Sequence, residues 1–170
     1  FVAPTDANGL YGAAVITNYP LDAPLSDEAL APDKIKLQIG VAPLAPDESL
    51  DEWVTRWRTF ETLGDHNGGM VLAASAIESS QVGPYAAMSY RINGSNASPN
   101  DVHEFNIRLD DRQVMVVGIS PADSAVAPLA LQILSGLEFD PMYRFAPEVL
   151  ALAESFRAAT VPSRGDSMSA

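Results

Sequence analysis

Few side chains in this sequence have the types and spacing that catalysis or metal binding requires. The 170-residue chain has no cysteine and only two histidines, His66 and His103. Without cysteine there are no disulfides, thiolate zinc sites, iron–sulfur clusters or cysteine nucleophiles. The sequence also holds no G-x-S-x-G elbow and no glycine-rich phosphate loop. We therefore expect no catalytic residue and no cofactor.

The best candidates for metal binding lie in a short polar loop. Asp65-x-Asn67-x-Gly69 is similar to the start of a calcium-binding loop, with His66 inside it. An EF-hand needs a bidentate glutamate where Ala76 stands. An ordinary glycine turn is thus the favoured interpretation, and calcium is the alternative. A zinc site would have to bring His66 and His103 together with carboxylates.

A second hypothesis makes the chain a small hydrolase, or a ligand-binding or metal-binding protein, with a pocket near both histidines. In that arrangement the fold gathers Asp65, His66, His103 and Glu104 into one cleft. A pair of carboxyl groups of the glycosidase kind also stays open among the 22 acidic residues, although no pair stands out in the sequence. The hypothesis that we prefer is that the protein is not an enzyme.

Charge limits the classes of partner. The net charge is −12, with nine acids and two bases in residues 1–52. Such a chain is repelled by nucleic acid and by anionic lipid surfaces. An acidic front of this kind suits a basic protein partner, or simply keeps a secreted protein in solution.

The elements that must position these residues begin with two strands and a helix. Residues 10–19 and 34–41 are typical of strands, and the second alternates strictly between apolar and polar positions. Ser49 and Glu52 form a capping box at the start of a helix. Its apolar stripe holds three aromatic anchors for the core, Trp53, Trp57 and Phe60.

Strands dominate the next part of the chain. Residues 71–82, 85–92, 102–109 and 113–119 read as strands, with turns at Gly83-Pro84 and Asp110-Asp111. A second helix follows a cap at Ser120, Asp123 or Ser124, and its predicted buried stripe is Val126, Ala130, Ile133, Leu134 and Leu137. A short strand at 137–139 and a third helix opened by Pro147 complete the order. The expected class is α+β, with a mostly antiparallel sheet of six or seven strands, helices packed on its faces and an extra C-terminal helix.

Several strings in this order resemble the PsbP-like superfamily, which includes the extrinsic photosystem II protein and bacterial extracytoplasmic relatives. They are Ser49-Leu50-Asp51-Glu52-Trp53, Gln81-Val82-Gly83-Pro84-Tyr85-Ala86, Leu109-Asp110-Asp111-Arg112-Gln113-Val114 and Ile133-Leu134-Ser135-Gly136-Leu137-Glu138-Phe139. The resemblance implies a lead-in at 1–8, a PsbP-like domain at 9–140, and an added C-terminal helix and polar tail at 141–170. It also implies a non-enzymatic role in which the domain docks on another protein, often at a membrane surface.

The preferred hypothesis is thus an extracytoplasmic binding or assembly domain that docks on a protein partner or a membrane-associated complex. The chain begins Phe1-Val2-Ala3-Pro4 without an initiator methionine, which fits a mature product after signal removal or a trimmed chain. Phe1 and Val2 are candidate partner contacts. A further alternative is a subunit that polymerises with copies of itself into a surface structure.

Overall fold

The structure is a computed structural model that describes residues 11–19, 29–62, 71–94 and 99–136. The strands in this part of the chain are β1 (Tyr11–Thr17), β2 (Lys36–Pro43), β3 (Glu78–Val82), β4 (Tyr85–Ile92), β5 (Val102–Arg108) and β6 (Gln113–Ser120). The helices are α1 (Leu50–Thr62), between β2 and β3, and α2 (Ala127–Ser135), after β6.

All the described strands form one sheet. Its order is β1-β2-β6-β5-β4-β3, and every neighbouring pair is antiparallel. Four of the five pairs are consecutive in the chain, and the fifth joins β2 to β6. This architecture confirms the predicted α+β class with a six-stranded antiparallel sheet and helices packed on it.

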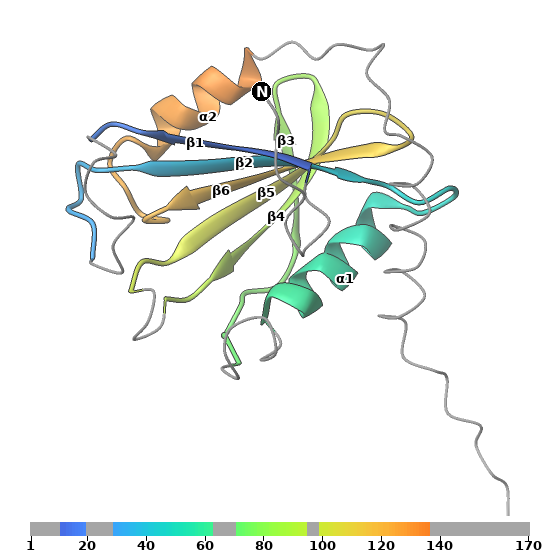
Figure 1. Cartoon of the computed structure of the whole chain (residues 1–170), viewed down its shortest axis with the longest axis horizontal. Coiled ribbons are helices and arrows are strands. Elements are labelled where there is room, and N and C mark those ends of the chain that lie inside the picture. Colours follow the sequence, from blue (N-terminus) through green and yellow to red (C-terminus); the bar gives the residue numbers. More distant parts are fainter. Residues whose placement is uncertain (1–10, 20–28, 63–70, 95–98, 137–170) are drawn as a thin grey trace, which may run out of the picture.

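The two helices cover opposite faces of the sheet (Figure 1). On the α2 side, Ala130 and Leu134 pack on a core that contains Phe105, Ile107 and Val117. On the α1 side, the buried residues are Ala42, Leu44, Leu50, Trp53, Val54, Trp57, Tyr90, Ile92, Val114 and Val116. Because both faces are covered, every residue of the central strand β6 is buried.

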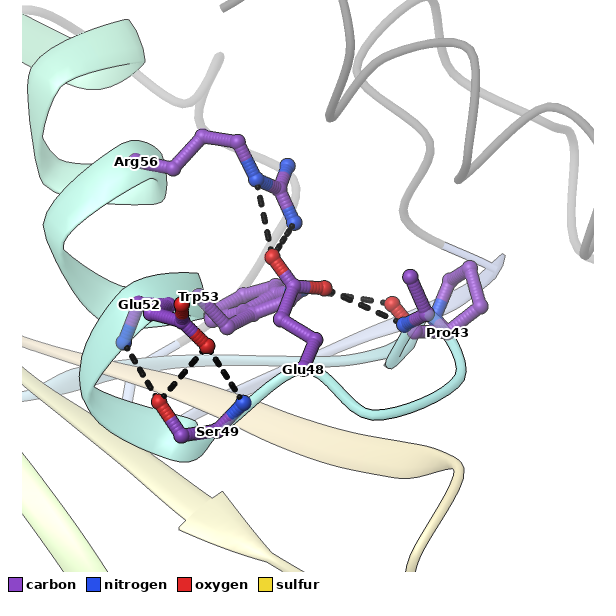
Figure 2. A network of polar contacts seen from close by, with 7 residues as sticks. Pro43, Glu48, Ser49, Glu52, Trp53 and Arg56 are labelled. Atoms are coloured by element: carbon purple, nitrogen blue, oxygen red, sulfur yellow. Dashed lines mark hydrogen bonds and ion pairs between the residues drawn. The ribbon is translucent and has the colours of Figure 1, made fainter. Parts of the chain in front are cut away.

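The start of α1 is stabilised by side chains, as the sequence predicts (Figure 2). The Ser49 N–H and hydroxyl donate to Glu52 Oε2 at 2.9 Å, and the Glu52 N–H donates back to Ser49 Oγ at 3.2 Å. Trp53 and Trp57 are buried, with stacked rings 5.3 Å apart, and Phe60 is half-buried. The Trp53 indole N–H donates to the carbonyl of Pro43, which joins α1 to the end of β2.

Three details of the local prediction are wrong. Residues 71–77 are not a strand: only an isolated bridge joins Ala74 to Ile92 before β3 begins at Glu78. The N-cap of α2 is Val126, which makes no side-chain capping bond. Ser124 is used elsewhere, since its hydroxyl donates to the Lys34 carbonyl at 2.9 Å.

The third correction concerns the outer side of α2. Ala130 and Leu134 are buried as predicted, but Ile133 is 56% exposed. The sequence of α2, APLALQILS, is apolar on nearly all sides, so the pattern does not distinguish its inner face from its outer face. Only packing against the sheet decides which residues are covered.

Some predictions concern residues outside the described part. These are the lead-in at 1–8, the strand at 137–139, and the C-terminal helix and tail at 141–170. Within the described part, neither helix has the length and apolar character needed to cross a membrane.

Candidate functional site

The strand β5 separates two of the residues predicted to share a cleft. His103 and Glu104 are neighbours in β5, and successive side chains of a strand point to opposite faces of the sheet. His103 lies on the α2 side, where its ring contacts Phe105, and Glu104 lies on the α1 side, where it contacts Tyr90. The two side chains therefore cannot line one pocket.

The other predicted site residues are not placed by the structure. Asp65, His66 and Asn67, and the predicted partner contacts Phe1 and Val2, lie outside the described residues. Among the residues that are described, no three histidine, aspartate or glutamate side chains gather in a way that would hold a metal ion.

His103 is half-buried on an inner strand rather than at a sheet edge. Its cross-strand partner in β4 is Arg91. The guanidinium of Arg91 forms an exposed ion pair with Asp123 at 2.6 Å. Burial lowers the pKa of His103 below its ordinary value, and the nearby charge of Arg91 lowers it further. The ring is therefore held neutral to a lower pH than a free histidine.

A buried polar cluster lies between α1 and the sheet. The Tyr90 hydroxyl is 2.7 Å from Glu61 Oε2 and 2.6 Å from Glu104 Oε1. Asn106 Nδ2 donates to the same Oε1 of Glu104 at 3.0 Å. Tyr90 and Glu104 are only 1% and 3% exposed, and Asn106 is fully buried. We call Glu61, Tyr90, Glu104 and Asn106 the carboxyl–tyrosine cluster.

Each member of the cluster is positioned by regular structure. Glu61 follows Trp57 by one helical turn, so it lies on the same buried side of α1. Tyr90 in β4 is directly opposite Glu104 in β5, and Asn106 is two residues further along β5 on the same face. A helix and two inner strands thus hold three buried polar groups and the half-buried Glu61 together.

Burial dominates the electrostatics of this cluster. Burial raises the pKa of Glu61 well above its ordinary value, and the charge of Glu104 raises it further. Burial also raises the pKa of Glu104, although hydrogen bonds from its neighbours oppose the shift. Burial and the two carboxyl groups together raise the pKa of Tyr90, so its hydroxyl stays protonated.

The sequence pattern did not predict this cluster as a unit. Glu104 was a candidate only for the cleft with Asp65, His66 and His103, and Glu61, Tyr90 and Asn106 were not candidates. A usable signal existed, because Glu61 falls on the aromatic stripe of α1 and Glu104 and Asn106 alternate with apolar residues in a strand. A charged residue at a position whose neighbours predict burial indicates a polar partner inside the fold.

The cluster has the two carboxyl groups of a glycosidase but not its open cleft. The Tyr90 hydroxyl fills the space between Glu61 and Glu104, and it contacts both of them. Because Tyr90 and Glu104 are almost wholly buried, no sugar can approach the pair in this conformation. The contacts of Tyr90 with both carboxyl groups join the last turn of α1 to β4 and β5.

Among the described residues, the outer side of α2 presents two large apolar side chains to solvent. Leu129 and Ile133, one helical turn apart, are 57% and 56% exposed, and Pro128 and Gln132 beside them are also exposed. No residue of α2 is charged. We call these four residues the α2 ridge, and a pair of large exposed apolar side chains at this spacing is typical of a helix that binds another surface.

Comparison with known proteins adds information on the fold. No family model matches the chain, and no curated protein matches it. Among solved structures it is similar to PA94, a protein of unknown function from Pseudomonas aeruginosa that is described as a candidate regulator. The match has a TM-score of 0.50 and 15% identity, and it covers 77% of this chain and 85% of PA94. At this identity the similarity shows a shared α+β fold, and it carries no information about activity.

Proposed function

We propose that this chain is a non-catalytic, extracytoplasmic protein-binding domain of the PsbP-like kind, which docks on a basic protein partner through the α2 ridge. The observation that carries the proposal is the exposure of Leu129 and Ile133 on one side of a helix whose other side is packed on the sheet. The resemblance of four sequence strings to the PsbP-like superfamily supports the same role.

The chemistry of the ridge fits the centre of an interface. Interface centres are depleted of charge and rich in large apolar side chains, while their rims are polar. The ridge carries no charge, and exposed ion pairs lie at the N-terminal end of α2: Asp123 with Arg91, and Asp33 with Lys34. The segment that carries Asp33 and Lys34 lies against the residues just before α2. The Ala125 N–H donates to the Pro32 carbonyl, and the Ser124 hydroxyl donates to the Lys34 carbonyl.

Charge favours a basic partner over a second copy of the same chain. Two copies would each bring a net charge of −12, and their mutual repulsion opposes association. A basic surface is attracted over a distance of about 10 Å at moderate salt, which speeds encounter. Apolar contact with Leu129 and Ile133 then supplies the short-range attraction.

The proposal is tested by photocrosslinking in cells that naturally make the protein. Benzoylphenylalanine is placed at position 129 in one variant and at Gln38, an exposed residue on the α1 side of β2, in the control. We expect position 129, and not position 38, to form an adduct with one basic protein. Adducts with another copy of the chain, with lipid alone, or equally from both positions would overturn the proposal.

Binding is then measured with that partner in purified form. The double variant Leu129→Glu/Ile133→Glu should weaken affinity about 10- to 100-fold, because truncated or charged anchors lose roughly 1–3 kcal/mol of binding free energy. The matched control Gln132→Glu adds charge to the same side of α2 without removing an apolar anchor, and it should change affinity less than threefold. Equal affinity for wild type and the double variant would contradict the role of the ridge.

A further inference from the structure

The geometry of the carboxyl–tyrosine cluster sets a requirement on hydrogen atoms. The Tyr90 hydroxyl carries one hydrogen, so it donates one hydrogen bond and accepts others. It lies within hydrogen-bond distance of two carboxyl oxygens, Glu61 Oε2 and Glu104 Oε1. If it donates to one of them, the other must itself carry a hydrogen to donate back. One of the two carboxyl groups is therefore protonated.

The neighbouring amide indicates which carboxyl group holds that hydrogen. Asn106 Nδ2 donates to Glu104 Oε1, the same oxygen that contacts Tyr90. An oxygen that accepts two hydrogen bonds is best matched by an ionised carboxylate. Tyr90 then donates to Glu104, and Glu61 donates to Tyr90. The bonds run in one direction, from Glu61 through Tyr90 to Glu104.

We propose that Glu61, Tyr90 and Glu104 form a binding site for a single proton, which resides on Glu61 and holds the last turn of α1 against β4 and β5. This site is independent of the proposed docking function, since it lies on the opposite face of the sheet from α2.

The surroundings explain why the proton is retained above the ordinary carboxyl pKa. The groups that influence these carboxyl groups include each other, Tyr90, Asn106 and the indole of Trp57. Arg58, earlier on α1, instead directs its guanidinium to the carbonyl of Ala74. On the strands beside Glu104 and Asn106, the register partners Met88, Val116 and Gly118 carry no charge. A second negative charge in this buried place is costly, and this is why burial raises the pKa of both carboxyl groups.

Release of the proton has a local structural consequence. With both carboxyl groups ionised, Tyr90 can donate to only one of them, and the other faces its oxygen without a hydrogen between. Glu61 is the penultimate residue of α1, so the lost bond is one that joins the end of the helix to the sheet. A rise in pH therefore loosens the contact between the last turn of α1 and β4.

Linkage gives the sign and size of the effect. The unfolded chain releases this proton above the ordinary carboxyl pKa of 4.5, whereas the folded chain retains it to a higher pH. The contribution of this site to stability is thus greatest below pH 4.5 and falls as pH rises, until the folded protein also loses the proton. Within that window a one-proton difference raises the unfolding equilibrium constant about tenfold per pH unit.

Chemical denaturation between pH 5 and 9 tests this with two variants. Glu61→Gln keeps a donor to Tyr90 but cannot ionise. Its unfolding equilibrium constant should therefore lack the tenfold rise per pH unit that this site gives the wild type. The matched control Glu78→Gln removes the same charge from an exposed position on β3 and should keep the wild-type dependence. An unchanged pH dependence in Glu61→Gln would overturn the proposal.

Infrared spectroscopy supplies a test that does not rely on refolding a variant. The folded wild-type protein at pH 7 should show the C=O stretching band of a protonated carboxyl group, which carboxylates lack. The band should be absent from Glu61→Gln and present in Glu78→Gln. Absence of the band from the wild type, or its loss in Glu104→Gln together with its retention in Glu61→Gln, would contradict the assignment to Glu61.

Discussion

Glu48 and Arg56 form an ion pair that is almost wholly removed from solvent. Arg56 Nη2 lies 2.9 Å from Glu48 Oε1, and the two side chains are 9% and 1% exposed (Figure 2). The other carboxylate oxygen of Glu48 accepts the N–H of Ala45 at 3.1 Å. One side chain thus ties the body of α1 to the turn that leaves β2.

Removing the charge of Glu48 should destabilise the fold strongly. Glu48→Gln leaves the buried guanidinium of Arg56 without its carboxylate, and breaking a buried pair on one side costs about 3–5 kcal/mol. Equilibrium unfolding in guanidinium chloride measures this. The control Asp111→Asn removes an exposed partner of Arg112 that is 4.0 Å away, and it should cost less than about 0.5 kcal/mol. A double variant Glu48→Gln/Arg56→Met that is no more stable than Glu48→Gln would argue against coupling of the pair.

Replacing Gly83 should disturb the turn between β3 and β4 together with the end of α2. Gly83 has a φ of +57°, and a Cβ built on it would lie 2.7 Å from the Ser135 carbonyl oxygen. Gly83→Ala should therefore cost about 2–4 kcal/mol, from the left-handed backbone and the overpacking together. Gly136→Ala is the control, because its φ is −95° and its nearest contact is an ordinary 3.6 Å. Thermal unfolding that ranks the two variants equally would contradict this contact.

The capping box of α1 should contribute measurably to stability. Ser49→Ala removes the acceptor for the Glu52 N–H, and loss of such a cap costs about 1 kcal/mol. Thr59→Ala in the middle of α1 removes a hydroxyl that bonds only within the helix, to the Thr55 carbonyl, and should be neutral or slightly stabilising. Urea denaturation of both variants makes the comparison; a cap variant as stable as wild type would show that water replaces the lost bond.

His103 should make the fold less stable in mild acid. Its pKa is lowered in the folded protein, so the unfolded chain takes up a proton first as pH falls below about 6.5. The stabilisation is present above that pH and is lost as pH falls through the folded pKa. His103→Gln should reduce the stability difference between pH 7.5 and pH 5.5 by less than about 1 kcal/mol, since solvent screens a half-exposed ring. This dependence runs opposite to that of the Glu61 site, so denaturation profiles of the two variants distinguish them.

The sequence by itself determined the α+β class, most strand positions and the start of α1. These follow from local physics: the apolar–polar alternation along residues 34–41, and the Ser49–Glu52 capping box at the first helical turn. Such signals depend on neighbouring residues, so they are readable without knowledge of distant contacts.

Only the tertiary structure decided which polar and apolar side chains act together. Glu61 and Tyr90 are 29 residues apart in the sequence and meet because α1 packs across β4. The exposure of Ile133 likewise follows from how α2 is turned on the sheet, since its apolar sequence fits either orientation. Long-range packing sets these relationships, and no periodicity within a single segment encodes them.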